Sequence, residues 1–268
     1  MAVRFDQSVT VITGGASGIG AALAKATRAK GAKVAILDRD ATLVREAAER
    51  LDVLGLTCDV GEESGLQTAL ARVADRLGPI DICVSNAGVF EGQPDHAASA
   101  PDAVWARSWQ VHVMAHVYAA RALLPEMLAR GSGCFVTIAS AAGLLNQIGD
   151  AAYSATKHAA VSFADSLAIS HGQAGIQVSL ACPQYVATPL IKDAEAGGQV
   201  LTAAQVAQCI VAGVEAGRFL ILPHPQVAGF ARRRAEDHDS WIKGMQRLQE
   251  RAVSELGHAD RAALYRLE

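Results

Sequence analysis

The chain has 268 residues, of which 51% are hydrophobic and 5% aromatic, and its formal net charge is −3. This length and composition fit one α/β domain with a large aliphatic core, and the charge gives no reason to expect nucleic acid or an anionic membrane as a partner. No apolar run approaches the ~18 residues of a membrane span, and residues 1–9 lack the apolar core of a signal peptide. We therefore expect a cytoplasmic protein with neither membrane nor nucleic-acid partners.

The cysteines argue against disulfides and against zinc. They are odd in number, include no Cys-x-x-Cys pair and mostly lie in apolar segments: Cys58, Cys83, Cys134, Cys182 and Cys209. This pattern predicts buried free thiols in a reducing compartment. His112 and His116 have the spacing of half a metal site, but no third ligand has a suggestive position. We therefore predict no metal.

The first 30 residues combine a strand, a glycine-rich turn and a helix. Residues 8–13 are a β-branched run that predicts a buried strand, and residues 21–30 favour a helix. Between them lies Gly14-Gly-Ala-Ser-Gly18-Ile-Gly20. In this context glycines allow the backbone to approach a pyrophosphate, which the amides at the helix N-terminus hold. The segment therefore predicts a dinucleotide-binding loop.

A second strand, predicted at residues 33–37, ends on Asp38. An acidic residue at this place can hydrogen-bond the ribose hydroxyls of an adenosine and repels a 2′-phosphate, so NAD is favoured over NADP. Arg39 could receive such a phosphate. No Arg or Lys within residues 14–20 supports that alternative, so Asp38 decides the prediction.

The alternation of strands and helices continues along the chain. Asp59-Val60 and Asn86-Ala87-Gly88 follow the next two predicted strands, which is where parallel sheets place ligands, although ordinary turn chemistry explains either signal alone. The predicted helices cover residues 42–51, 62–77, 101–130, 151–171 and 203–213, and the remaining strands residues 54–58, 80–85, 134–139, 176–182 and 219–222.

Two further segments stand apart from this alternation. Residues 190–201 include two adjacent glycines and predict a mobile flap over a site. Residues 231–268 carry eight Lys/Arg and seven Asp/Glu, about twice the charge density of the whole chain. We interpret residues 1–230 as the dinucleotide-binding and catalytic domain, and residues 231–268 as a charged helical C-terminal appendage of that domain.

Three residues have the pattern of an acid–base site. Tyr153 and Lys157 are four residues apart, so on a helix they share one face, and the ammonium lowers the phenol pKa from about 10 toward neutrality. Ser140 ends a predicted strand, where its hydroxyl can hold a carbonyl or alcohol oxygen. A Tyr and a Lys at this spacing are more often a surface pair. The independent glycine-rich motif favours catalysis.

Together, the glycine-rich turn, the Asp after the second strand, Asn-Ala-Gly, Ser and Tyr-x-x-x-Lys resemble the short-chain dehydrogenase/reductase family over roughly residues 5–222. The resemblance implies a single Rossmann-type doubly wound parallel sheet with helices on both faces, and hydride transfer with NAD. It assigns catalysis to Ser140, Tyr153 and Lys157. It assigns the coenzyme to Thr13, Gly14, Ser17, Gly18, Ile19, Gly20, Asp38, Asp59, Val60, Asn86, Ala87, Gly88, Tyr153, Lys157, Pro183, Val186 and Thr188.

The chain departs from the family pattern at two places. His112 stands where the family usually has an Asn that helps to hold a water between the lysine and solvent. A neutral imidazole can donate and accept, so our hypothesis is that His112 takes over this catalytic role. Gln184 stands where the family favours Gly, and it adds a side chain beside the nicotinamide region.

We expect an NAD-dependent enzyme that interconverts a hydrophobic secondary alcohol and its ketone. The predicted substrate site comprises Ser140, Gly143, Leu144, Leu145, Ile148, Gln184 and Tyr185. The resemblance also implies a homodimer or homotetramer through the helices at residues 110–128 and 151–169, with the appendage capping a neighbour.

Two alternatives remain open. An NADPH-linked 3-oxoacyl reductase calls for a basic patch and a phosphate-binding Arg or Lys in the glycine loop, and neither is evident. A nucleotide-binding regulatory protein that has lost catalysis draws support from His112 and Gln184, and the intact trio of Ser140, Tyr153 and Lys157 argues against it.

Overall fold

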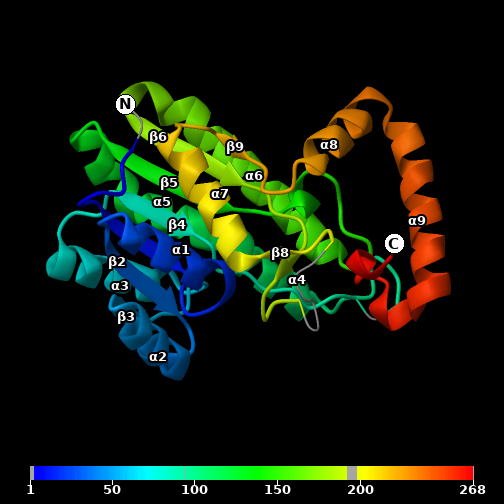
Figure 1. Cartoon of the computed structure of the whole chain (residues 1–268), viewed down its shortest axis with the longest axis horizontal. Coiled ribbons are helices and arrows are strands. Elements are labelled where there is room, and N and C mark those ends of the chain that lie inside the picture. The colour runs from blue at the N-terminus through cyan, green and yellow to red at the C-terminus, as the bar shows by residue number, and fades with distance from the viewer. Residues whose placement is uncertain (1–2, 94, 192–197, 268) are drawn as a thin grey trace.

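The computed structural model describes residues 3–93, 95–191 and 198–267. Its centre is a seven-stranded sheet in the order β3-β2-β1-β4-β5-β6-β9, in which every neighbouring pair is parallel (Figure 1). The strands are β1 (Val9–Thr13), β2 (Lys33–Asp38), β3 (Leu54–Thr57), β4 (Ile82–Ser85), β5 (Gly133–Ile138), β6 (Ile176–Ala181) and β9 (Leu220–Ile221). The strand order reverses between β1 and β4, which places a ligand crevice at their carboxyl ends. The predicted doubly wound sheet is confirmed.

Helices cover both faces of this sheet (Figure 1). One face packs against α1 (Gly18–Ala29), α2 (Ala41–Leu51) and α7 (Ala203–Glu215), and the other against α3 (Glu63–Leu77), α5 (Ala115–Ala129) and α6 (Ala151–His171). Along β1, Val11 lies in one core cluster and Ile12 in the other, because successive side chains of a strand point to opposite faces. Burial on both faces explains why the strands read as continuous apolar runs.

The long helical region predicted at residues 101–130 changes its winding part-way along. The structure has α4 (Asp102–Trp109), a π-helical segment at Gln110–Met114, and then α5. A π-turn inserts one extra residue into the helical ladder and turns the following side chains, which commonly happens at functional sites. His112 lies in the middle of this segment and is fully buried. The predicted helical region is therefore confirmed, but helical periodicity does not reveal the local change of winding.

The C-terminal helices begin earlier than predicted. α8 (Gln226–Glu236) contains the expected boundary at residue 231, and α9 (His238–Asp260) follows. A 3₁₀ turn, Leu264–Arg266, lies in the tail, which returns to the body of the molecule (Figure 1). We call residues 226–267 the handle. The sequence also missed a two-stranded sheet, β7 (Val186–Ala187) and β8 (Leu201–Thr202).

Several remaining predictions concern single segments. The predicted flap falls partly on residues 192–197, which lie outside the described residues, and its last residue belongs to β8. All five cysteines are free; four are buried and Cys209 is half-buried. Within the described ranges, no helix is long and apolar enough to cross a membrane.

Candidate active site

The glycine-rich loop lies at the crevice between β1 and β4, beside a cavity of about 570 Å³. Gly14 has φ +61°, and a Cβ there would lie 2.8 Å from Ala87 Cα; Gly18 has φ +52°. Both conformations favour glycine, and the close approach at Gly14 requires it. α1 begins at Gly18 and has no acidic side chain in its first turn, so its positive end is open toward the cavity. This cradle fits the pyrophosphate of a dinucleotide.

Asp38 stands at the end of β2 on the rim of the same cavity. One carboxylate oxygen accepts a hydrogen bond from Ala16 N at 3.2 Å and the other from Arg39 N at 2.8 Å. These bonds orient the carboxylate and leave lone pairs for ribose hydroxyls. Arg39 also lines the cavity, so the two groups that discriminate between an unsubstituted and a phosphorylated ribose meet at one place.

Two of the predicted coenzyme residues, Thr13 and Gly20, support the glycine-rich loop without lining the cavity. The Thr13 hydroxyl accepts hydrogen bonds from the backbone amides of Asn86 at 2.9 Å and Ala87 at 3.1 Å. The Asn86 side chain donates back to the carbonyls of Thr13 and Gly14. A Cβ at Gly20 would lie 2.1 Å from the Gly14 carbonyl oxygen. Thr13 and Gly20 therefore hold the crevice in shape and do not line it.

The other predicted coenzyme residues line this cavity. They come from the glycine loop, from the ends of β2, β3 and β4, from α6, and from the segment after β6: Gly14, Ser17, Gly18, Ile19, Asp38, Asp59, Val60, Asn86, Ala87, Gly88, Tyr153, Lys157, Pro183, Val186 and Thr188. Segments distant in the sequence thus converge on one crevice, as the topology requires.

Ser140, Tyr153 and Lys157 converge at the inner end of the crevice. Ser140 follows β5, and its hydroxyl accepts a hydrogen bond from Ala142 N at 3.1 Å. Lys157 is buried on α6, donates to the carbonyl of Ile138 at 3.0 Å, and holds its Nζ 5.7 Å from the ring centre of Tyr153. Ser140 and Tyr153 also line a second, larger cavity. The predicted trio is therefore assembled where the two cavities meet.

Burial governs the ionisation of this pair in the coenzyme-free chain. It raises the pKa of Tyr153 to about 12, and a hydrogen bond with Ser140 acts in the opposite direction. Burial also lowers the pKa of Lys157 from 10.5 to about 8. The expected lowering of the Tyr153 pKa by Lys157 is therefore not found here. Desolvation disfavours both charged forms and is the largest influence on the pKa of each residue.

His112 is fixed at both ring nitrogens. Its Nε2 accepts a hydrogen bond from Val89 N at 3.0 Å, and its Nδ1 lies 2.8 Å from the Thr156 hydroxyl, which itself donates to the carbonyl of Ala152. Nδ1 must therefore carry the proton. Burial holds the pKa of His112 well below 6.5, so the ring is neutral. The ring also packs edge-on against Tyr153, with centres 5.3 Å apart.

These bonds give His112 a different character from the expected proton relay. With both nitrogens engaged by the protein, the ring has neither a free proton nor a free lone pair to pass on. It joins the loop after β4 to α6 directly beneath Tyr153. The geometry favours a positioning role. Among the described residues, no group of three metal-binding side chains could hold an ion.

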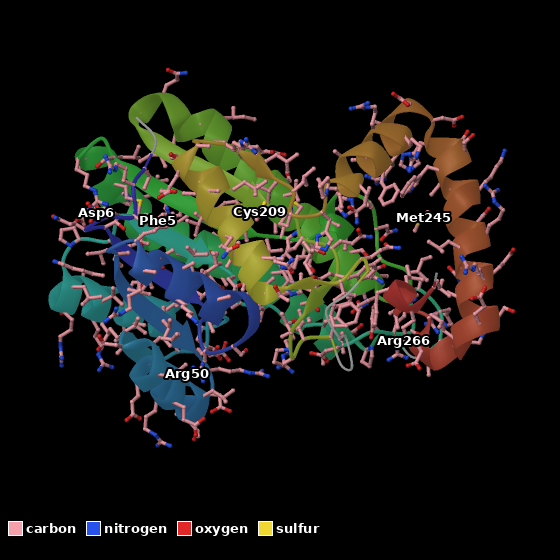
Figure 2. The ribbon with its side chains drawn as sticks, in the orientation of Figure 1. Phe5, Asp6, Arg50, Cys209, Met245 and Arg266 are labelled. Atoms are coloured by element: carbon pink, nitrogen blue, oxygen red, sulfur yellow. The ribbon has the colours of Figure 1, made fainter. Side chains whose placement is uncertain are left out.

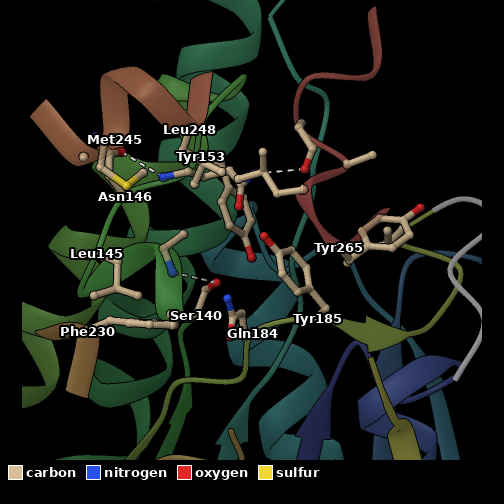
Figure 3. A pocket seen from close by; sticks show the side chains of 18 of the residues that line it. Ser140, Leu145, Asn146, Tyr153, Gln184, Tyr185, Phe230, Met245, Leu248 and Tyr265 are labelled. Carbon is tan, nitrogen blue, oxygen red and sulfur yellow. Dashed lines mark hydrogen bonds between the residues drawn. The ribbon is translucent and has the colours of Figure 1, made fainter. Parts of the chain in front are cut away.

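The larger cavity has a volume of about 980 Å³ and opens onto Ser140 and Tyr153. Figure 3 shows these two residues and Tyr185 directed toward the same space, with side chains of α9 across from them. Of the predicted substrate residues, Leu145, Gln184 and Tyr185 also line it.

Three predicted substrate residues lie outside the walls of this cavity. A Cβ at Gly143 would lie 2.6 Å from the carbonyl oxygen of Lys157, so this glycine packs against the backbone of α6. Leu144 packs into the small core cluster around Leu145, and Ile148 is buried. The apolar run after Ser140 is thus shared between cavity wall and core, a division that composition alone does not reveal.

The short chain dehydrogenase family model matches residues 8–198. The chain belongs to this family. It is 32% identical over 223 residues to 2-(R)-hydroxypropyl-CoM dehydrogenase of Xanthobacter autotrophicus, covering 76% of this chain and 89% of that protein. It is 31% identical over 252 residues to 1-deoxy-11-beta-hydroxypentalenate dehydrogenase of Streptomyces exfoliatus, covering 89% and 90%.

The fold also matches a solved member of the short-chain dehydrogenase family. The crystal structure of a short-chain dehydrogenase/reductase from Burkholderia phymatum in complex with NAD superposes with a TM-score of 0.80 at 28% identity, covering 88% of this chain and 96% of that chain. This chain is therefore an oxidoreductase of the kind that acts on CH–OH groups.

Sequence reasoning missed three residues that support the site of this short-chain dehydrogenase. Asp150 caps α6 by accepting a hydrogen bond from Tyr153 N at 2.9 Å. An Asp directly before a predicted helix indicates such an N-cap, so the sequence could have revealed it. His224 accepts from Gln184 N at 3.1 Å and donates to the Tyr185 carbonyl at 3.0 Å, which fixes the segment after β6. Phe90 packs edge-on against Tyr153. Nothing local in the sequence marks these last two.

Proposed function

We propose that the protein is an NAD-dependent dehydrogenase that interconverts a hydrophobic secondary alcohol and its ketone. One observation carries this proposal: Ser140 and Tyr153 line both the dinucleotide crevice and the larger, partly apolar cavity. A substrate oxygen at this junction touches the acid–base residues and lies next to the coenzyme cavity at the same time. NAD, when bound, supplies the hydride acceptor.

The residues of the junction have distinct roles in this proposal. In alcohol oxidation, the Tyr153 phenolate oxygen takes the hydroxyl proton, and in ketone reduction the Tyr153 hydroxyl returns it. The Ser140 hydroxyl holds the substrate oxygen. The ammonium of Lys157 favours the phenolate, which is favoured further by the positive charge that NAD⁺ brings when bound. His112 keeps α6 and the neighbouring loop in register beneath Tyr153.

Asp38 supports NAD as the coenzyme. Its carboxylate is held at the ribose end of the crevice, where its charge repels a 2′-phosphate. The similar enzyme from Burkholderia phymatum was crystallised with NAD. Arg39 at the same rim keeps NADP as the alternative that the experiment must test.

Substrate class and assembly belong to the same proposal. Two similar relatives carry the names of dehydrogenases of hydroxyl compounds, 2-(R)-hydroxypropyl-CoM and 1-deoxy-11-beta-hydroxypentalenate. Trp109, directly before residue 110, is 48% exposed and Ile169 on α6 is 82% exposed, which supports a homodimer or homotetramer through the helices at residues 110–128 and 151–169. Light scattering after size exclusion measures the mass of the assembly. The buried free thiols support work in the cytoplasm.

The deciding experiment measures NADH formation from NAD⁺, with NADP⁺ in parallel, across aliphatic, cyclic and aromatic secondary alcohols. The Tyr153→Phe variant is the control. We expect turnover with NAD⁺ and a loss of turnover in the variant. Tight NADH binding without turnover on any alcohol or on the corresponding ketones would support the regulatory alternative instead.

A further inference from the structure

The handle is attached to the catalytic domain at both ends. At its first end, Val227 of α8 is fully buried and belongs to a small core cluster with Ala141 and Leu145, against which Phe230 packs. The Arg234 guanidinium donates to the carbonyl of Leu144 at 2.8 Å. This end therefore rests on the segment that directly follows Ser140.

The second end docks beside the catalytic helix. Arg261 is 3% exposed and donates to the carbonyls of Gln93 and His258, each at 2.9 Å. The Gln147 side chain donates to the carbonyl of Ala262 at 3.1 Å. Gly149 has φ +84°, and a Cβ there would lie 3.0 Å from the Ala262 Cβ. The tail is thus held on the loop that leads into α6 and Tyr153.

Between these attachments, α9 presents an apolar face to the larger cavity. Trp241, Met245 and Leu248 line the cavity and follow the spacing of one helix face. Figure 2 shows Met245 on the side of α9 that faces the body of the molecule. Ile242 and Gln246, which lie between them in the sequence, are exposed on the other side. The inner face is only half-buried, so it retains apolar surface that a ligand can cover.

The charges of the cavity disfavour an anionic ligand. Carboxylates outnumber guanidinium groups among its lining residues, which include Glu91, Glu236, Asp237 and Asp260 against Arg233 and Arg266. Asp260 is paired with Arg266 at 3.2 Å and Glu91 with Arg107 at 3.3 Å. The guanidinium of Arg233 lies 5.0 Å from the ring centre of Phe230, and the carboxylates of Glu236 and Asp237 set the net negative charge of the lining. A carboxylate or phosphate entering this space would meet an excess of like charge.

We propose that the handle is the far wall of the substrate site, and that the substrate is a bulky, uncharged, largely apolar secondary alcohol or ketone. Its oxygen lies at Ser140 and Tyr153, and its opposite end covers Met245 and Leu248. This inference rests on the proposed function and adds the substrate class. A cavity of about 980 Å³ is far larger than a four-carbon alcohol needs, and lies at the upper end of small-molecule sites, roughly 300–1,000 Å³.

The first test compares small and bulky alcohols. Steady-state rates with NAD⁺ are measured for 2-butanol, 4-methylcyclohexanol, decahydro-2-naphthol and 4-hydroxycyclohexanecarboxylate. The variants are Met245→Asp and Leu248→Asp on the inner face of α9, with Gln246→Asp on its outer face as the matched control. Circular dichroism and thermal melting establish that all three variants fold.

We expect the wild-type kcat/KM to be highest for decahydro-2-naphthol, and higher for 4-methylcyclohexanol than for the matched carboxylate. Met245→Asp and Leu248→Asp should lower kcat/KM for the bicyclic alcohol at least tenfold, the scale on which an apolar pocket senses lost contacts. The rate with 2-butanol should change less than twofold, and Gln246→Asp should change neither. Equal losses for small and bulky alcohols, or a preference for the carboxylate, would overturn the inference.

A second test needs no turnover. The neutral fluorescent probe N-phenyl-1-naphthylamine is titrated into the full chain, where we expect it to bind the cavity. Its Kd should rise at least tenfold in Met245→Asp and remain unchanged in Gln246→Asp. If the probe binds with these differences in Kd between the two variants but no alcohol is oxidised, the proposed function is contradicted while the ligand site beside α9 is supported. Oxidation of alcohols with no difference between Met245→Asp and Gln246→Asp refutes the handle as a substrate wall.

Discussion

Replacing Lys157 by Met should stabilise the coenzyme-free protein at neutral pH. The side chain is 3% exposed, and burial lowers its pKa from 10.5 to about 8. Since one pKa unit corresponds to about 1.4 kcal/mol, the buried ammonium costs roughly 3 kcal/mol of unfolding free energy. Methionine removes this cost but also the charge-assisted hydrogen bond to the carbonyl of Ile138, worth about 2 kcal/mol. The net gain in Lys157→Met is about 1 kcal/mol.

The stability advantage of Lys157→Met over the wild type must decrease as the pH rises. The pKa of Lys157 is lower in the folded state than in the unfolded state, so the unfolded chain binds more protons between pH 8 and 10.5. The stability of the wild type therefore rises with pH across this window. Lys157→Met has no such group. Its advantage should be full below pH 8 and fade as the pH approaches 10.5.

Urea unfolding at a fixed protein concentration measures both effects, at pH 7 and again between pH 8 and 10. Fixed concentration matters because assembly would shift the apparent stability. Other groups that titrate in this range are common to both proteins and cancel in the difference. A stability difference that does not change with pH would contradict this reasoning, as would a variant less stable than the wild type at pH 7. Either result would show that burial of the charge does not control the pKa of Lys157.

Three further changes test the site. Tyr153→Phe should lower kcat by about 1,000-fold or more and leave NADH binding, followed by fluorescence, nearly intact; lost binding would make Tyr153 structural. Asp38→Asn keeps the shape but removes the charge, so the preference for NAD⁺ over NADP⁺ in kcat/KM should fall about 10- to 100-fold, and an unchanged ratio would exclude Asp38 as the selector. Burial keeps the pKa of His112 well below 6.5. His112→Leu leaves the partly buried Val89 N–H without its acceptor, so thermal melting should show a loss of about 1 kcal/mol of unfolding free energy. We also expect kcat to fall while the pH–rate profile keeps its shape; a shifted profile would restore the relay hypothesis.

The sheet and most helices could be predicted because their signals are local. Apolar β-branched runs followed by turns gave the strands, and the helix predicted at residues 151–171 has the same bounds as α6. The glycine loop could also be predicted, because a positive φ and a close backbone approach at Gly14 restrict the residue type. Where a single residue type satisfies a strict geometric requirement, the sequence records that requirement. The functional roles of the lining residues stay predictions until variants are measured.

Other features depend on contacts between distant segments. In the π-turn, the ring of His112 contacts Val89 and Thr156, and the sequence marks neither partner. His224 supports the segment after β6 from a loop about forty residues away. The ionisation of Tyr153 was mispredicted for the same reason. Spacing shows which charge lies near, but only the packed structure shows that burial of the phenol raises its pKa.

The two cavities at Ser140 and Tyr153 differ in how strictly they constrain the chain. The coenzyme crevice is built within residues 8–198, which the family model matches. Its pyrophosphate cradle requires glycine, which has no side chain, at fixed positions. The far wall of the larger cavity comes from the handle, beyond that match, and needs only apolar side chains at helical spacing. Many sequences meet such a loose requirement. The reaction type can therefore be predicted from motifs, whereas the substrate is selected by a surface that carries no motif and must be derived from the fold.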